Sequence, residues 1–139
     1  LSPNIELEWI KKTHSPTIIK TRFIDIYTNN KVLGVYDLND ELLNDDEEME
    51  FKNKVDACIN NFDFVVVVDY GHGLITSKIV KTLEEKSKYL AVNTQLNSFN
   101  IGYHTISKYS NAAYVCVHEG ELRHDYRNGN HCFWRSCFA

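Results

Sequence analysis

The hydrophobic residues of this chain change their spacing along the sequence, and these changes predict its secondary structure. The run Asp63-Phe64-Val65-Val66-Val67-Val68-Asp69 is apolar between acidic ends, which is typical of a strand buried on both faces of a parallel sheet. Shorter apolar runs predict two more strands, at Tyr89–Asn93 and Ala113–Val117. We therefore expect these three strands to form the core sheet.

Helical spacing of apolar residues occurs between the predicted strands. It predicts a helix from about Glu47 to Asn61, a second helix capped by Thr76 or Ser77, and a short helical segment at Tyr103–Tyr109. Strands that alternate with helices indicate the α/β class, with a parallel sheet, right-handed crossovers and helices on both sides.

The two ends of the chain differ from this central part. Residues 1–16 have a mixed composition and are interpreted as a connector, whereas Thr17–Ile26 and Lys31–Leu38 flank a turn at Asn29-Asn30 and predict a β-hairpin lid. Residues 130–139 crowd Cys, Phe, Trp and Arg together without periodicity. They are interpreted as an atypical tail, foreign or out of frame, with a small C-terminal strand as the alternative. The predicted domain spans residues 17–129.

Composition excludes two classes of partner. The formal net charge of −4, from 15 basic and 19 acidic residues, provides no basic field for nucleic acid. The longest apolar run is too short to cross a bilayer, and the first residues do not resemble a leader peptide. We therefore expect neither nucleic acid nor a membrane as a partner.

The four cysteines show no spacing typical of a zinc site or of a disulfide framework. A chain of 139 residues is also long enough to bury a core without cross-links. Reduced thiols are the favoured interpretation, and they fit a cytoplasmic location. The cysteines are Cys58, Cys116, Cys132 and Cys137.

Polar residues follow each predicted strand of the sheet, where α/β proteins bind their ligands. These strand ends are Asp69-Tyr70-Gly71, Asn93-Thr94-Gln95 and His118-Glu119-Gly120-Glu121. The carboxylate of Asp69 could accept hydrogen bonds from turn amides or orient a substrate. Gly71 and Gly73 permit positive φ, which serves either close approach to a ligand or a sharp turn.

Three segments, taken in order, carry a resemblance to a known family. They are Ile19-Lys20-Thr21-Arg22-Phe23, Val68-Asp69-Tyr70-Gly71-His72-Gly73 and His118-Glu119-Gly120-Glu121-Leu122. Their order and spacing over residues 17–127 resemble the middle of ribokinase-type (PfkB family) carbohydrate kinases, with heptose-phosphate kinases the most similar. In that family the first segment belongs to a β lid beside the sugar site, the second forms a turn after a central strand, and the third lies near magnesium and phosphate.

The resemblance implies a partial ribokinase-like fold and a role in transferring the γ-phosphate of ATP to a hydroxyl of a sugar or sugar phosphate, with Mg²⁺ as cofactor. It implies Glu121, acting through water, and His118 as metal contacts. Some relatives also carry a fused nucleotidyltransferase domain. The implied substrate-binding residues are Lys20, Arg22, Asp69, Tyr70, Gly71, Gly73 and Asn93.

Each of these assignments has a structural alternative. Lys20 and Arg22 lie on the same side of a predicted strand, which could be an ordinary solvated face. Glu121 could instead be an acidic residue that the dipole favours at a helix N-terminus. His72 is more typical of an exposed loop than of a catalytic base.

Several departures from the family affect the expected activity. His72 replaces a Lys that is frequent in the heptose kinases, and His118 replaces the Asn of the third motif. The 139 residues contain no counterpart of the family's Gly-Gly sugar-binding segment or of the Gly-x-Gly-Asp segment that carries the catalytic base. We therefore expect an internal piece of a kinase, inactive as this chain, with open sheet edges that favour oligomers or aggregation. The alternative is a non-catalytic α/β binding module.

Overall fold

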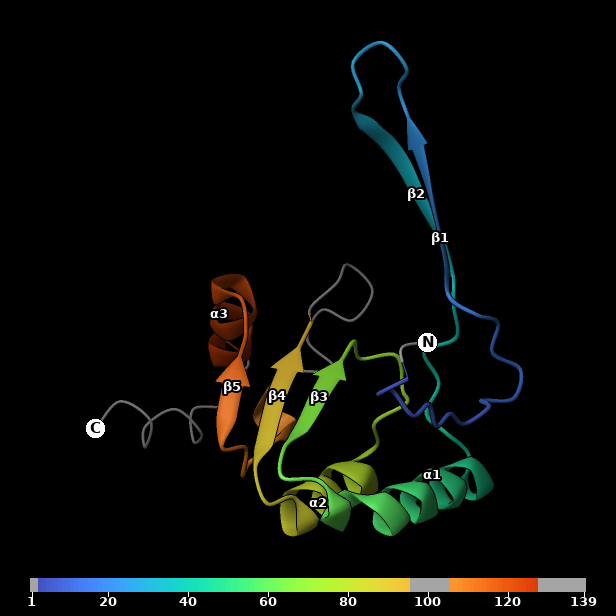
Figure 1. Cartoon of the computed structure of the whole chain (residues 1–139). Helices are drawn as coiled ribbons and strands as arrows, with labels where there is room; N and C mark the ends of the chain where they lie inside the picture. The colour runs from blue at the N-terminus through green and yellow to red at the C-terminus, as the bar shows by residue number, and fades with distance from the viewer. Residues whose placement is uncertain (1–2, 96–105, 128–139) are drawn as a thin grey trace.

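A computed structural model of the chain describes residues 3–95 and 106–127. These residues form two separate sheets, a two-stranded hairpin and a three-stranded sheet (Figure 1). The strands are β1 (Ile19–Ile24), β2 (Lys31–Asp37), β3 (Val65–Asp69), β4 (Leu90–Thr94) and β5 (Tyr114–Cys116). The helices are α1 (Asp45–Cys58), α2 (Ser77–Lys86) and α3 (Glu119–Arg127), with 3-10 turns η1 (Ile59–Asn61) and η2 (Ile106–Lys108).

The three-stranded sheet confirms the predicted α/β arrangement. Its order is β3-β4-β5, and both neighbouring pairs are parallel, with Val67 opposite Val92 and Val92 opposite Val115. Residues of α2 and η1 pack with the inward-facing residues of β3 and β4 in one core. Ile79 of α2 and Val92 of β4 lie at its centre, with 0% and 1% exposure.

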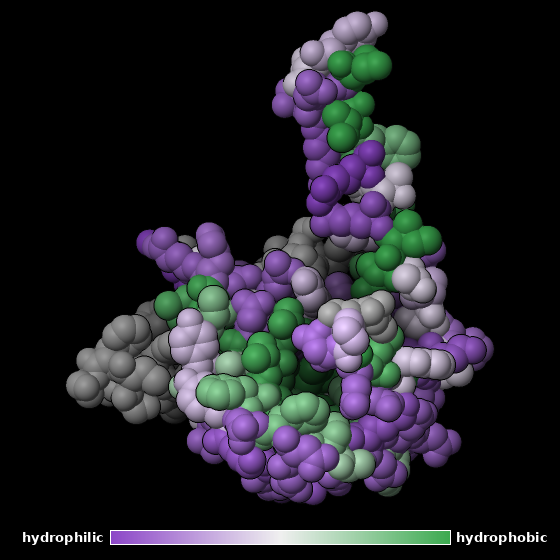
Figure 2. Space-filling model, viewed as in Figure 1, coloured by the Kyte–Doolittle hydropathy of each residue, from purple (hydrophilic) through white to green (hydrophobic). Residues whose placement is uncertain are grey.

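The prediction that β3 is buried on both faces is wrong for the described residues. Val67 and Asp69 face the core, but Val66 and Val68 on the opposite face are 68% and 51% exposed. Figure 2 shows hydrophobic side chains uncovered in the middle of the body, between the hairpin and the helices. A run of four valines is apolar on both faces, so its composition alone does not reveal which face is covered.

The open face of β3 leads to a prediction about association. Exposed apolar strands at a sheet edge favour pairing with other chains, and a charged side chain opposes it. We expect the protein to associate as its concentration rises, and Val66→Lys to shift light scattering toward the monomer mass. Leu7→Lys, at a connector residue that is 63% exposed, is the matched control. Equal association of the two variants would contradict a role of the β3 face.

The hairpin confirms the predicted antiparallel pair, and it projects away from the body (Figure 1). Because side chains alternate, Lys20 and Arg22 share one face with Tyr36, which lies opposite Lys20. The other face carries Ile19, Phe23, Leu33 and Val35, all of them exposed. The hairpin therefore has one basic face and one apolar face.

The predicted two-residue turn of the hairpin is too short. Strand β1 ends at Ile24 rather than Ile26, and Asp25 closes the following loop by accepting hydrogen bonds from the amides of Tyr27 (2.9 Å) and Thr28 (2.7 Å). Asn29 adopts a positive φ of 55°. A carboxylate that bonds amides two and three residues ahead ends strand pairing early.

Several predicted helix boundaries also shift. Helix α1 begins at Asp45 because Asn44 and Glu47 form a capping box there, and its predicted last turn is η1. Thr76, rather than Ser77, caps α2. Of the predicted segment Tyr103–Tyr109, residues 106–109 fall within the described residues, and Ile106–Lys108 form a 3-10 turn there.

Some expectations concern residues that the structure does not describe. The atypical tail 130–139 lies outside the described residues, as do Cys132 and Cys137, whereas Cys58 and Cys116 carry free thiols. Among the described residues, none of the helices has the length and apolar character needed to traverse a bilayer.

Candidate functional site

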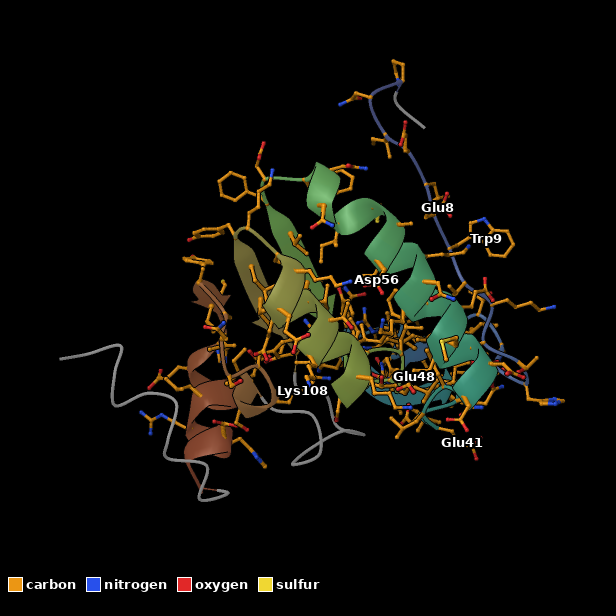
Figure 3. The ribbon with its side chains drawn as sticks, turned by 90° about the horizontal axis from the view of Figure 1, so that it is seen from below. Glu8, Trp9, Glu41, Glu48, Asp56 and Lys108 are labelled. Atoms are coloured by element: carbon orange, nitrogen blue, oxygen red, sulfur yellow. The ribbon has the colours of Figure 1, made fainter. Side chains whose placement is uncertain are left out.

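The turn that follows β3 is organised around the buried carboxylate of Asp69, which is 5% exposed. It accepts hydrogen bonds from the Gly71 amide (2.9 Å) and the Tyr109 hydroxyl (2.8 Å), and it forms an ion pair with Lys108. Lys108, labelled in Figure 3, belongs to η2, the described element between β4 and β5 in the sequence. Both Asp69 oxygens are thus engaged within the protein, and the bond from the Gly71 amide is the turn contact that the structural alternative for Asp69 predicted.

The pKa values of this cluster follow from its contacts. Burial by itself would raise the pKa of Asp69, but the Lys108 ammonium, the Gly71 amide and the Tyr109 hydroxyl together hold it below the ordinary value. Burial, and then the neighbouring Asp69 charge, raise the pKa of Tyr109 well above its ordinary value. Tyr109 therefore stays protonated and Asp69 stays charged at neutral pH, which is the pairing that the hydrogen bond requires.

Gly71 and Gly73 confirm the predicted positive φ, with values of 69° and 77°. A Cβ on Gly73 would lie only 2.0 Å from the main-chain oxygen of Glu41. The close approach at Gly73 is thus to the protein's own backbone, in the segment that follows β2. This contact places the β3 turn directly against the base of the hairpin.

A groove of about 320 Å³ lies between the base of the hairpin and the carboxyl ends of the parallel strands. Lys20, Tyr36 and Leu38 line it from the hairpin side. Tyr70, His72 and Gln95 line it from the strand ends. Two of the predicted substrate-binding residues, Lys20 and Tyr70, therefore come together, although 50 positions separate them in the sequence.

The hairpin wall of the groove is positively charged. The Lys20 ammonium lies 4.7 Å from the centre of the Tyr36 ring, and its hydrogen bond to Tyr36, assisted by the charges of Lys20, Lys31 and Arg22, lowers the pKa of the Tyr36 hydroxyl. Across residues 3–95 and 106–127, no carboxylate forms an ion pair with Lys20, Arg22 or Lys31. Because none of these three cations pairs with a carboxylate in that part of the chain, this face is suited to an anionic group.

His72 lines two cavities of the protein. It lines the groove and also a second, largely apolar cavity of about 270 Å³ that includes Lys12, Ile18 and Val68. Its Nδ1 lies 3.0 Å from an oxygen of Asp40, so the ring orientation is set from the segment after β2. The residue expected as an ordinary loop histidine is therefore part of the site.

The residues implied as metal contacts have a structural role at the start of α3. The Glu121 carboxylate accepts a hydrogen bond from the His118 amide (2.6 Å), and His118 Nδ1 accepts one from the Gly120 amide (3.0 Å). Together they cap the helix, as the structural alternative for Glu121 anticipated. The described part of the chain contains no group of three or more His, Cys, Asp or Glu side chains placed to hold a metal ion.

The remaining predicted residues are distributed unevenly around the site. Asn93 lies away from the groove lining, and its side-chain amide donates to the main-chain oxygen of Cys116 (2.7 Å), joining β4 to β5. Arg22 lies two residues further along β1 than Lys20, on the same basic face. Gly71 and Gly73 shape the turn without lining the groove.

Sequence reasoning did not single out Tyr36, Lys12, Lys108 or Tyr109. The hairpin register would have revealed Tyr36, because it lies directly opposite Lys20. Lys108 and Tyr109 give no local signal, since their partner Asp69 is 40 residues from Tyr109 in the chain.

The fold and the groove define a mixed α/β protein with a candidate anion-binding site at the strand ends. Comparison with known proteins adds no family to this description, because no family model matches the chain and neither a curated protein nor a solved structure gives a significant match.

Proposed function

We propose that this chain provides the sugar-phosphate-binding part of a ribokinase-type carbohydrate kinase, which transfers the γ-phosphate of ATP to a sugar hydroxyl. The observation that supports this proposal is the groove between the basic hairpin face and the strand ends. It combines aromatic rings, which suit the faces of a sugar, with the ammonium group of Lys20, which suits a phosphate.

In the proposed complex, the tyrosines contact the sugar ring and the hairpin cations bind the phosphate. Tyr36 and Tyr70 line opposite sides of the groove, so a sugar ring between them would contact apolar surface. Lys20 lines the groove and supplies a charge-assisted hydrogen bond to the phosphate. Arg22, two residues further along the same face of β1, adds a guanidinium that can bind two phosphate oxygens. A phosphorylated sugar offers apolar ring faces to the tyrosines and an anionic group to the cations, whereas a plain sugar offers no anionic group.

The described residues fit the Mg²⁺ of the proposed activity less well than they fit a sugar phosphate. The Glu121 carboxylate is engaged in the cap of α3, and the described residues do not assemble a metal centre, so we derive no catalytic step through Mg²⁺. The 139 residues also contain no Gly-x-Gly-Asp segment to supply a base. Binding, rather than turnover, is therefore the property by which the proposal is tested.

Binding of phosphorylated and plain sugars to the wild-type protein and two charge variants tests the proposal. We expect hexose and heptose phosphates to bind, and Lys20→Met or Arg22→Met to weaken that binding about tenfold, because each change removes a charge-assisted hydrogen bond. Isothermal titration calorimetry at low and high salt measures the effect, and salt should weaken binding to the wild type.

Lys81→Met is the matched control, since it removes the same charge from an exposed lysine of α2 that pairs with Glu85. Its affinity should equal that of the wild type. Wild-type protein that binds no sugar phosphate, or binds it as well without Lys20 and Arg22, would refute the proposal.

A further inference from the structure

The two walls of the groove belong to separate sheets that share no strand pairing. The hairpin wall is formed by residues of β1 and β2 and the residue after β2, and the other wall by the turns after β3 and β4. Their spacing therefore depends on contacts at the base of the hairpin, where residues 39–41 pass beside the turn at residues 71–73.

The Lys12 ammonium joins these two segments. It donates hydrogen bonds to the main-chain oxygens of Asn39 (2.8 Å) and Glu41 (2.5 Å), after β2, and of His72 (3.3 Å), after β3. An ammonium group has three donors, so each can serve one of these carbonyls. Lys12 belongs to a third segment, the connector at residues 1–16. Its ammonium group therefore bridges the segment after β2 and the segment after β3.

Lys12 is itself held in place by its neighbours. The Thr13 amide donates to the Glu47 carboxylate of α1 (2.5 Å), and the Asn39 side chain donates to the main-chain oxygen of His14 (3.2 Å). Two contacts reinforce the same junction, the pair of His72 with Asp40 and the close approach of Gly73 to Glu41. The junction is thus a fixed crossing of three segments, with α1 as its support.

We propose that Lys12 is a positioning residue that sets the distance between the hairpin wall and the strand-end wall of the groove. It acts through the main chain of residues 39–41 and of His72. Lys12 lines the smaller cavity and not the groove, so it does not contact a ligand in the groove. The identity of that ligand rests on the proposed function, whereas the junction itself does not.

Lys12→Met tests this role because methionine keeps an unbranched side chain but donates no hydrogen bond. Without the junction, only a fraction of the molecules hold the two walls in the arrangement that binds the ligand. The apparent dissociation constant then rises in inverse proportion to that competent fraction. We expect hydrogen exchange of peptides covering residues 36–42 and 70–75 to accelerate. Calorimetric affinity for a hexose 6-phosphate should fall about tenfold if the competent fraction falls to about one tenth.

Two further variants separate positioning from charge. Lys11→Met removes the same charge from the adjacent exposed residue and should behave as the wild type in both measurements. Lys12→Arg retains donors that reach carbonyl oxygens, so it should restore slow exchange and most of the affinity. If Lys12→Met does not fold, Lys12→Gln takes its place, since its amide can still bond one carbonyl.

The two measurements distinguish the two proposals. Exchange and affinity of Lys12→Met that match those of Lys11→Met would overturn the positioning role. Wild-type protein that binds no sugar phosphate, but whose exchange still responds to Lys12→Met, would overturn the proposed ligand and leave the junction supported.

Discussion

Asp69→Asn is expected to lower the free energy of unfolding by about 3 kcal/mol, because it removes one member of a buried ion pair. The side chain of Asp69 is 5% exposed and that of Lys108 is 24% exposed. Removing the Asp69 charge leaves the Lys108 ammonium without its anionic partner. The Tyr109 hydroxyl and the Gly71 amide also lose a charged acceptor. Urea unfolding followed by circular dichroism measures the change.

Asp63→Asn provides a matched control, because Asp63 also pairs with a lysine, Lys88, at 2.9 Å, but its side chain is 82% exposed. Exposed pairs contribute little, so this variant should differ from the wild type by less than about 1 kcal/mol. Equal effects of the two substitutions would show that the Asp69 cluster does not stabilise the fold.

The same carboxylate predicts how stability depends on pH. The contacts of Asp69 hold its pKa in the folded protein below the ordinary value of 3.8. The stabilisation is therefore present above that ordinary value, and it is lost as the pH falls through the lower pKa of the folded state. Asp69→Asn should flatten the fall in stability of the wild type in this acidic range, and Asp63→Asn should not.

Gly73→Ala is expected to destabilise the protein by about 3 kcal/mol, since two unfavourable effects add at this residue. Its φ of 77° lies in the left-handed region, where a side chain costs about 1–2 kcal/mol. The new Cβ would also lie 2.0 Å from the main-chain oxygen of Glu41, so one backbone segment must shift. Thermal unfolding measures the loss, and hydrogen exchange at the hairpin base should rise with it.

Gly120→Ala is the appropriate comparison. A Cβ there meets only the His118 side chain, at 3.2 Å, and Gly120 lies in the first turn of α3. Alanine in a helix is favoured over glycine by about 0.5–1 kcal/mol, so this variant should be as stable as the wild type or slightly more stable. A mild effect of Gly73→Ala, similar to that of Gly120→Ala, would contradict the close approach at the hairpin base.

The secondary structure was predictable because its signals are local. Each signal comes from neighbouring residues. The four valines between Asp63 and Asp69 specify a strand, the helical spacing before them specifies a helix, and the acceptor side chain of Thr76 specifies the start of the next helix. Errors arose where a side chain changed a boundary, as the carboxylate of Asp25 did at the end of β1 and the Asn44 cap did at the start of α1.

The candidate site was predictable only in part. The rule that ligands bind beyond the carboxyl ends of parallel strands pointed to Tyr70, and alternation along β1 placed Lys20 and Arg22 on one face. The pattern could not show that Glu121 and His118 cap a helix, because a carboxylate near a strand end suits both a cap and a metal.

The sequence by itself determined the order of the elements, the parallel sense of the sheet and the hairpin, since hydrophobic periodicity and turn residues act over a few positions. Only the tertiary structure decided which face of β3 is open, that Asp69 pairs with Lys108, and that Lys12 joins the hairpin base to the β3 turn. Lys12 and His72 are 60 residues apart in the chain. Contacts at such separations depend on how the elements pack together, which no local pattern of residues encodes.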